Sequence, residues 1–105
     1  MLSRNITLTL ILFISSLNVS FAMDTGFDEI CTIYTEVKNS NMTKEVASKY
    51  ILDNIKSRVK SAAALQTHEA IMSALGNVRY DIFKESAELT LKKSWSCPSM
   101  KSLMH

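Results

Sequence analysis

The chain of 105 residues contains two cysteines, two glycines and one proline, and its twelve Lys and Arg residues nearly balance ten Asp and Glu residues, for a formal net charge of +2. A charge this low excludes the clustered basic face that normally identifies a nucleic-acid-binding domain. Few Gly and Pro residues and many Ala, Leu, Lys, Glu and Met residues favour helices over strands. We therefore expect an all-α protein that does not bind nucleic acid.

Residues 1–22 have the pattern of a secretory signal peptide. A basic start at Arg4 precedes a hydrophobic run from Ile6 to Ile14 that only two threonines interrupt. Residues 20–22, Ser-Phe-Ala, place small side chains at the two positions that signal peptidase inspects. The pattern predicts an exported protein, periplasmic or secreted, from which these residues are removed.

A retained N-terminal membrane anchor is the alternative. A membrane-spanning helix needs about 20 predominantly apolar residues, and Ser15, Ser16 and Asn18 interrupt this one. No later segment is apolar for long enough to span a bilayer. We expect no stable membrane insertion once the signal peptide is removed.

Removal of 22 residues from 105 leaves residues 23–105, a chain of 83 residues whose formal charge is +1 because Arg4 is lost. This length allows a single small domain, which buries only about 60–65% of the surface that its unfolded chain exposes. Domains of this size commonly need a covalent staple.

Apolar residues recur at helical spacing in four segments of this domain. The first helix is expected over residues 27–38, with Phe27 and Tyr34 on its apolar face. The second should begin after Thr43, whose hydroxyl can accept from the first free amides, and should run to about residue 60.

Residues 60–64 contain no strong helix breaker, so the second and third helices could form one rod. However, the apolar positions after residue 61 are displaced by about one residue from the stripe of the second helix, or roughly 100° around the axis. This shift predicts a new helix with Ser61 as its N-cap.

The third helix is expected to end at Gly76 in the left-handed conformation, and the fourth to run from about Val78 to Trp95 with Asn77 as its cap. Pro98 is expected to prevent further regular helix, which leaves residues 99–105 as a frayed tail or one short turn. Four short amphipathic helices with tight loops predict a compact bundle, either orthogonal or up-down.

Cys31 lies on the inner face of the first predicted helix, and Cys97 follows the last. In an exported protein an even number of cysteines is most simply a disulfide framework. The two residues are 66 positions apart, and closing a loop of that length stabilises a fold by about 4 kcal/mol in the chain-entropy model. We predict a Cys31–Cys97 disulfide that Trp95 covers.

A copper site is the alternative for Cys97. The set Cys97, Met100, Met104 and His105 falls within nine residues, and soft thiolate and thioether ligands select Cu(I). Such a site needs a reduced Cys97, and methionine also serves as core filler. The disulfide is the simpler interpretation, and it requires no metal and no cofactor.

His68 begins half of a zinc-protease motif, because the position of the second histidine, four residues on, holds Met72. His68 also falls on the apolar side of the third predicted helix, where we expect a partly buried imidazole bonded to a backbone carbonyl. Because the charge of a histidine changes between about pH 5 and 8, His68 is also a candidate pH sensor.

No segment carries a recognisable catalytic constellation, and the carboxylates lie on predicted polar faces beside lysines, where nothing would raise their pKa. Four apolar residues lie off the main stripes and would form a partner or dimer surface if they are exposed together: Ile33, Leu52, Ile82 and Leu89. We expect a non-enzymatic exported protein that acts through contacts with an unidentified protein partner or with itself.

Two further functional hypotheses remain open. One is copper binding by the C-terminal cluster. The other is an acid-stress chaperone-like role, suggested by the combination of a signal peptide, short helices and one disulfide. Protonation of ten carboxylates would leave eleven Lys and Arg residues and two histidines, a charge near +13 whose self-repulsion would loosen a small bundle.

Overall fold

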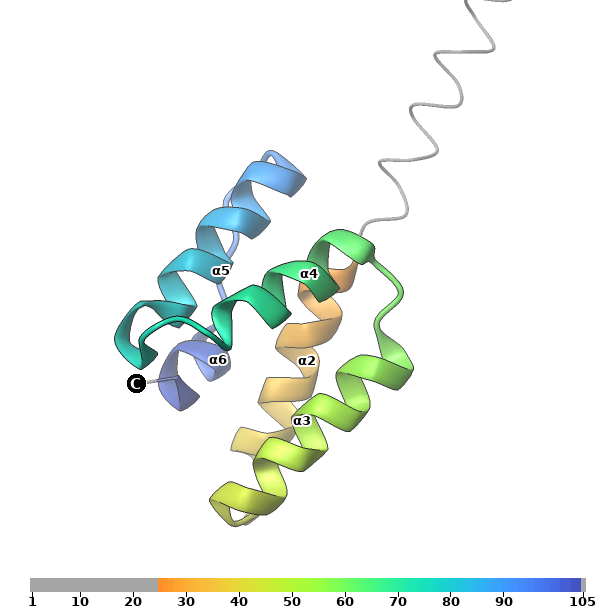
Figure 1. Ribbon diagram of the computed structural model, residues 1–105, viewed down its shortest axis with the longest axis vertical. Coiled ribbons are helices and arrows are strands. Elements are labelled where there is room, and N and C mark those ends of the chain that lie inside the picture. Colours follow the sequence, from red (N-terminus) through yellow and green to blue (C-terminus); the bar gives the residue numbers. More distant parts are fainter. Residues whose placement is uncertain (1–24, 105) are drawn as a thin grey trace, which may run out of the picture.

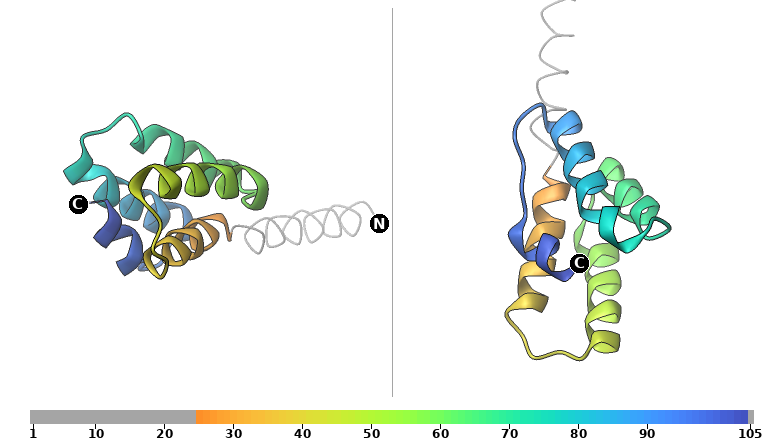
Figure 2. Two further views of the ribbon diagram at one scale, coloured as in Figure 1. Left: turned by 90° about the horizontal axis from the view of Figure 1, so that it is seen from below. Right: turned by 90° about the vertical axis from the view of Figure 1, so that its left-hand side faces the viewer.

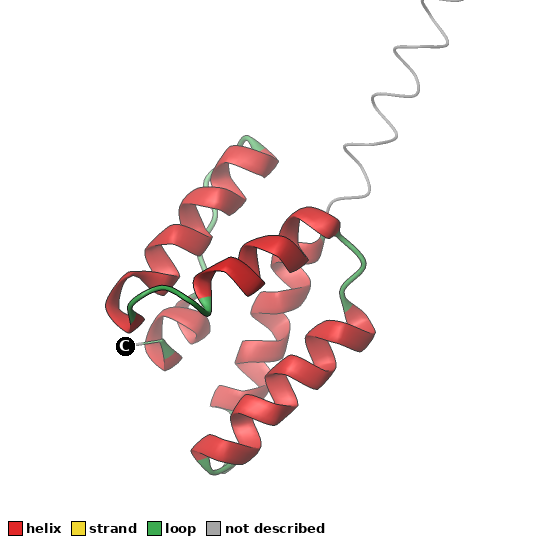
Figure 3. Cartoon of the chain, in the orientation of Figure 1, coloured by secondary structure: helices red, strands yellow, loops and turns green. Residues whose placement is uncertain are grey.

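A computed structural model of the protein describes residues 25–104, and the predicted signal peptide at residues 1–22 lies outside this range. The described chain forms five helices and no strand: α2 (Gly26–Lys38), α3 (Lys44–Arg58), α4 (Ala62–Ile71), α5 (Gly76–Leu91) and α6 (Pro98–Leu103) (Figures 1 and 3). The predicted all-α fold and its single disulfide are confirmed, and α6 is an additional helix.

Helix α2 is the centre of the fold, since it packs against α3, α4 and α6, while α5 packs mainly against α4. In Figure 1, α4 crosses in front of α2, with α3 on one side and with α5 and α6 on the other. This central place explains why Ile33 is fully buried. The prediction that Ile33 lies off the buried face was wrong, because α2 is covered from several sides rather than along one stripe.

Both predicted N-caps in the middle of the chain are confirmed. The hydroxyl of Thr43 accepts from the Val46 amide at 3.4 Å, and that of Ser61 accepts from the Ala64 amide at 3.2 Å. Val59 and Ser61 have extended backbone, so the chain changes direction where the apolar pattern shifts. Helices α3 and α4 are therefore separate, as predicted.

The predicted end of the third helix was wrong. Helix α4 ends at Ile71 rather than at Gly76, which is the first residue of α5 and does not have a positive φ. The Arg79 side chain closes the turn instead, with Nε donating to the Ala74 carbonyl and Nη2 to the Met72 carbonyl, each at 3.0 Å. A side chain thus satisfies carbonyls that a left-handed glycine was expected to satisfy.

The C-terminal segment also differs from the prediction. Helix α5 ends at Leu91 rather than at Trp95, and the left-handed residue that terminates it is Lys92, with φ of 57°. Pro98 then begins a helix instead of preventing one, because the first turn of a helix does not need the amide hydrogen that proline lacks. Met100 of α6 is fully buried, so this segment belongs to the core and is not a frayed tail.

An aromatic cluster occupies the space between α2, α5 and the segment before α6. The ring centroids of Phe27 and Phe83 are 5.3 Å apart, and the Trp95 ring lies 5.5 Å from Phe83 and 6.5 Å from Phe27. The three side chains are nearly or completely buried. Such edge-on pairs add to the stabilisation that burial alone supplies.

The starts of α2 and α4 approach each other closely at Gly26. A Cβ atom added to Gly26 would lie 2.5 Å from the Ser61 Cβ and 2.7 Å from the Ala64 Cβ. No side chain fits at this position without displacing the first turn of α4. Thr25 does not cap α2 with its side chain, and its hydroxyl donates to the Glu29 carboxylate at 2.9 Å.

Candidate functional site

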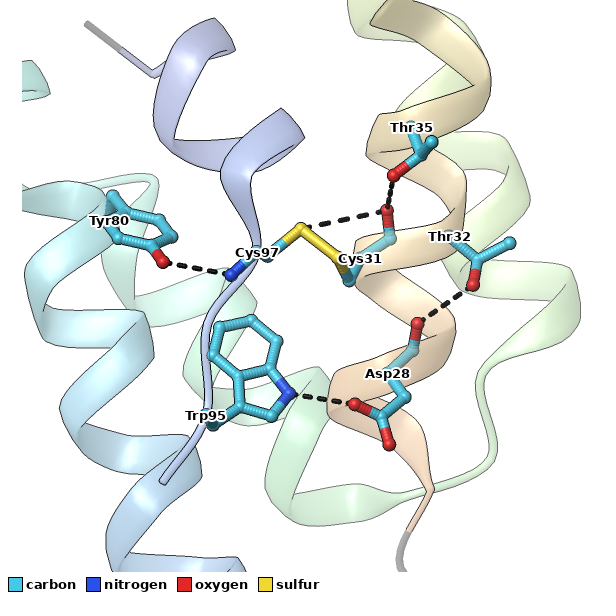
Figure 4. Close-up of a disulfide and its surroundings, with 7 residues drawn as sticks. All are labelled: Asp28, Cys31, Thr32, Thr35, Tyr80, Trp95 and Cys97. Atoms are coloured by element: carbon cyan, nitrogen blue, oxygen red, sulfur yellow. Dashed lines mark hydrogen bonds between the residues drawn. A yellow bond between two sulfur atoms is a disulfide. The ribbon is translucent and has the colours of Figure 1, made fainter. Parts of the chain in front are cut away.

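The disulfide joins α2 to the start of α6, with the Cα atoms of Cys31 and Cys97 5.8 Å apart (Figure 4). Two hydrogen bonds fix the segment that carries Cys97. The Cys97 amide donates to the Tyr80 hydroxyl at 2.9 Å, and Nε1 of Trp95 donates to the Asp28 carboxylate at 2.8 Å. Figure 4 shows the Trp95 indole beside the disulfide, where the sequence placed it.

The alternative copper ligands are not brought together around a thiolate. The Cys97 sulfur is bonded to Cys31, Met100 is fully buried, Met104 is partly buried, and His105 lies outside the described residues. Within residues 25–104, no group of three or more His, Cys, Asp or Glu side chains could hold a metal ion. The copper hypothesis therefore applies only to a chain whose disulfide has been reduced.

His68 of α4 is buried against Tyr34 of α2. The Tyr34 hydroxyl and Nε2 of His68 share a hydrogen bond of 2.7 Å, and the His68 ring lies 6.3 Å from the ring of Phe83. His68 is 3% exposed, and this burial lowers its pKa to about 4, while burial raises the pKa of Tyr34. The prediction that His68 bonds to a backbone carbonyl was wrong, because its partner is the hydroxyl of Tyr34 on the neighbouring helix. A role as pH sensor stays a prediction.

A polar cluster fastens α3 to α2. Arg58 donates from Nη1 and Nη2 to the two carboxylate oxygens of Glu36, at 2.7 and 3.0 Å, and the Tyr50 hydroxyl donates to the same carboxylate at 2.7 Å. The hydrogen bonds from Arg58 and Tyr50 lower the pKa of Glu36 to about 2. This cluster positions α3 but offers no free acid or base for catalysis.

The four apolar residues predicted to form one surface lie in three different places. Ile33 is buried, Leu52 is 53% exposed on α3, and Ile82 and Leu89 are exposed on α5. Two further residues extend the α5 set along the helix, namely Leu75 and Val78. Leu75, Val78, Ile82 and Leu89 form what we call the α5 stripe. The sequence analysis did not include Leu75 or Val78 in the predicted surface.

A second surface feature, which sequence reasoning did not anticipate, is a groove of about 580 Å³. We call it the α3 groove. It lies between the N-terminal half of α3 and the end of α6, and the C-terminal part of α2 lines it. Its residues come from five separate parts of the chain, so only the folded topology could reveal it.

The described chain thus presents a covalent staple, a buried histidine–tyrosine pair, an exposed apolar stripe and a partly apolar groove. None of its helices is both long and apolar enough to cross a membrane. Comparison with known proteins adds no functional assignment: no family model, no curated protein and no solved structure matches the chain.

Proposed function

We propose that this chain is an exported, non-enzymatic protein that acts by binding a helix of a partner protein along the α5 stripe. One observation supports this proposal above the others. Four large apolar side chains, three on α5 and one at its N-cap, are 36–76% exposed, although the domain is small and needs its apolar residues for its core.

The spacing of the stripe indicates which kind of partner fits. Leu75, Ile82 and Leu89 are seven residues apart, and Val78 occupies the intermediate position after the first. Apolar residues at this repeat form the seam by which one helix packs against another. The stripe extends over the 15 residues from Leu75 to Leu89, a rise of about 21 Å, which matches three turns or more of a facing helix.

Export is supported by two features of the chain. A disulfide persists in oxidising compartments and is rare in the cytosol. The signal-peptide pattern of residues 1–22 agrees with that location.

Site-specific photocrosslinking in the native host tests the proposed contact. A photoreactive amino acid is placed singly at each stripe position and, as controls on the same helix, at Asn77 and Asp81, which are exposed off the stripe. We expect adducts of one discrete mass from the stripe positions and none from the two controls. Equal crosslinking at both sets, or none at the stripe, would contradict the proposal.

A second copy of the chain can satisfy the same spacing, because Leu75 and Leu89 lie at equal distances on either side of Ile82 in the sequence. An antiparallel pair of α5 helices would place each Leu75 against the partner's Leu89. The mass of the adduct separates these outcomes. An adduct of twice the mass of the chain would mean that the stripe binds a second copy and not a different protein.

The buried histidine favours a second candidate, an acid-responsive chaperone-like role. Burial lowers the pKa of His68, which shares a hydrogen bond of 2.7 Å with Tyr34. The positive charge of Arg79 acts on Tyr34. Acid that protonates His68 would weaken the contact between α2 and α4. Binding of an apolar dye at about pH 3 would support this role, whereas a chain that stays cooperatively folded at that pH without dye binding would remove it.

A further inference from the structure

The α3 groove has the dimensions of a small-molecule site. Its volume of about 580 Å³ lies within the range of roughly 300–1,000 Å³ that is usual for ligand pockets. The right-hand view in Figure 2 shows the C-terminal end of the described chain beside α3, and Leu103 and Met104 line the groove together with residues of α3. The groove is separate from the α5 stripe, since none of the stripe residues lines it.

The groove exists because α3 is incompletely covered. Ile55 is the only residue within α3 that is fully buried, although Tyr50 and Ile51 pack partly against the core. The apolar side chains that line the groove include Met42, Ile51, Leu52, Met72, Leu103 and Met104. Three of these are methionines from three different segments. Methionine is flexible and polarisable, so such a lining adapts to an alkyl chain of varied shape.

The charged side chains of the groove are all positive. Lys38, Lys44 and Arg79 line it, and no Asp or Glu among residues 25–104 does. Three other basic residues of the described chain pair with carboxylates outside the groove, as Arg58 does with Glu36 at 2.7 Å. No such ion pair joins any of the three groove cations to a described carboxylate.

Arg79 is held in place before any ligand arrives. Its bonds to the Met72 and Ala74 carbonyls use two of its five N–H donors and fix the guanidinium in the lining of the groove. A fixed guanidinium recognises a carboxylate or phosphate with less ordering cost than a mobile lysine does.

We propose that the α3 groove binds a single-chain anionic amphiphile, a fatty acid or a ligand of the same chemistry, with its head group among Lys38, Lys44 and Arg79. The alkyl chain lies along the methionines. The lining supports both the alkyl chain and the head group of this ligand. An apolar wall alone would accept any hydrophobic ligand, but a wall whose charged side chains are all positive selects a negative head group. This ligand site is independent of the partner contact proposed for the α5 stripe.

The direct test compares head groups on one chain length. Decanoate, decyltrimethylammonium and decyl maltoside are titrated, each below its micelle concentration, into the full disulfide-bonded chain. Binding is followed by calorimetry and by the NMR signals of the methionine methyl groups. We expect decanoate to shift the signals of Met42, Met72 and Met104 and to bind at least about tenfold more tightly than the cationic amphiphile. Equal affinity for the three amphiphiles, or methyl shifts outside the groove, would overturn the assignment.

A pair of matched variants locates the head group. Lys44→Glu reverses one groove charge at the start of α3, where an acidic residue suits the helix dipole and should not weaken the helix. Lys56→Glu makes the same charge change on the same helix, outside the groove. Decanoate affinity should fall about tenfold in the first variant and change less than about twofold in the second. An equal loss in both would mean a general effect of net charge, and the proposed head-group site would be wrong.

One further outcome distinguishes the class of ligand. An acidic amphipathic peptide carries the same combination of charge and apolar surface. If such a peptide binds in the groove and decanoate does not, the small-molecule assignment is overturned in favour of a polypeptide ligand. Crosslinking from the α5 stripe is unaffected by either result, so failure of the groove proposal and failure of the partner proposal are seen separately.

Discussion

The two ends of α2 lie in contrasting surroundings. In its first half Phe27 and Ile30 are fully buried, Phe27 packs against the ring of Phe83, and the disulfide joins this half to the start of α6. Its second half ends in Tyr34, Val37 and Lys38, which line the α3 groove. The contrast teaches that the aromatic cluster and the disulfide lie at one end of α2, whereas the other end borders a partly apolar groove.

The two kinds of connection differ in their physics. At the first end, α5 and the Trp95 segment are joined to α2 by ring packing, the disulfide and the hydrogen bond from Trp95 to Asp28. At the second end, the partly exposed Glu36 cluster fastens α3 to α2, and Ile55 is the buried core residue of α3. Ion pairs in such positions contribute less to stability than buried rings do.

Removing the disulfide should have the largest effect on the tightly packed end. The double variant Cys31→Ser/Cys97→Ser lacks the constraint on 66 residues of chain and should lose about 4 kcal/mol of unfolding free energy. Urea unfolding followed by Trp95 fluorescence measures this loss. An unchanged midpoint would show that aromatic packing alone holds this end together.

Acidification should have the next largest effect, through His68. Its folded pKa of about 4 lies below the ordinary value of 6.5. The contribution of neutral His68 is therefore complete above pH 6.5 and is lost as the pH falls toward 4, because only the unfolded chain binds the proton in that interval. The loss amounts to about 3 kcal/mol.

A double variant isolates the histidine from the carboxylates, which also titrate in acid. In Tyr34→Phe/His68→Leu both members of the buried hydrogen bond are replaced, so neither polar group is left unpaired. Unfolding free energies of the natural chain and the variant, measured at about pH 7 and pH 4, should fall more steeply for the natural chain. Parallel curves would mean that His68 does not contribute.

Substituting each of the two glycines by alanine should change the unfolding free energy by an intermediate amount, and the two variants form a matched pair. Gly26→Ala places a Cβ against Ser61 and Ala64 and should cost about 1–3 kcal/mol, because the start of α4 must move. Gly76→Ala meets no atom within 4 Å and lies in a helix, so it should be neutral or stabilise the chain by up to about 1 kcal/mol. Thermal unfolding of both variants checks the expected difference in sign.

Loosening the other end should have the smallest global effect. Glu36→Gln removes the charge that Arg58 and Tyr50 bind, so the amides of α3 should exchange with solvent faster while those of α2 and α5 remain protected. Asp53→Asn is the control, since it breaks the exposed Lys49–Asp53 pair within α3 without touching α2. Similar exchange in both variants would show that Glu36 does not anchor the helix.

Local patterns predicted most of the fold. The hydroxyls of Thr43 and Ser61 act on amides three residues away, and the shift in apolar phase between them is a property of the chain itself. The disulfide was predictable because two cysteines allow a single pairing. Predictions that depended on which side chains pack around a residue were less successful: Gly76 was assigned a left-handed turn that the Arg79 side chain makes unnecessary.

The surfaces were harder to predict for the same reason. Exposure of Ile82 and Leu89 followed from their places on a single helix, but burial of Ile33 depends on how many neighbours surround α2. The α3 groove joins Met42, Met72 and Met104, which no periodicity relates to one another. Helix α6 was missed because Pro98 was treated as a helix breaker, although a proline is well accommodated in the first turn.

The Cys31–Cys97 bond closes most of the described chain into a covalent ring that contains all of α3, α4 and α5. A protease that cuts once inside this ring, for example beside the exposed Lys92 and Lys93, opens the ring but releases no fragment. The two pieces of the nicked molecule stay covalently joined until a reductant separates them. The aromatic cluster beside the disulfide can remain packed. The disulfide thus confers tolerance of surface cleavage as well as stability of the fold.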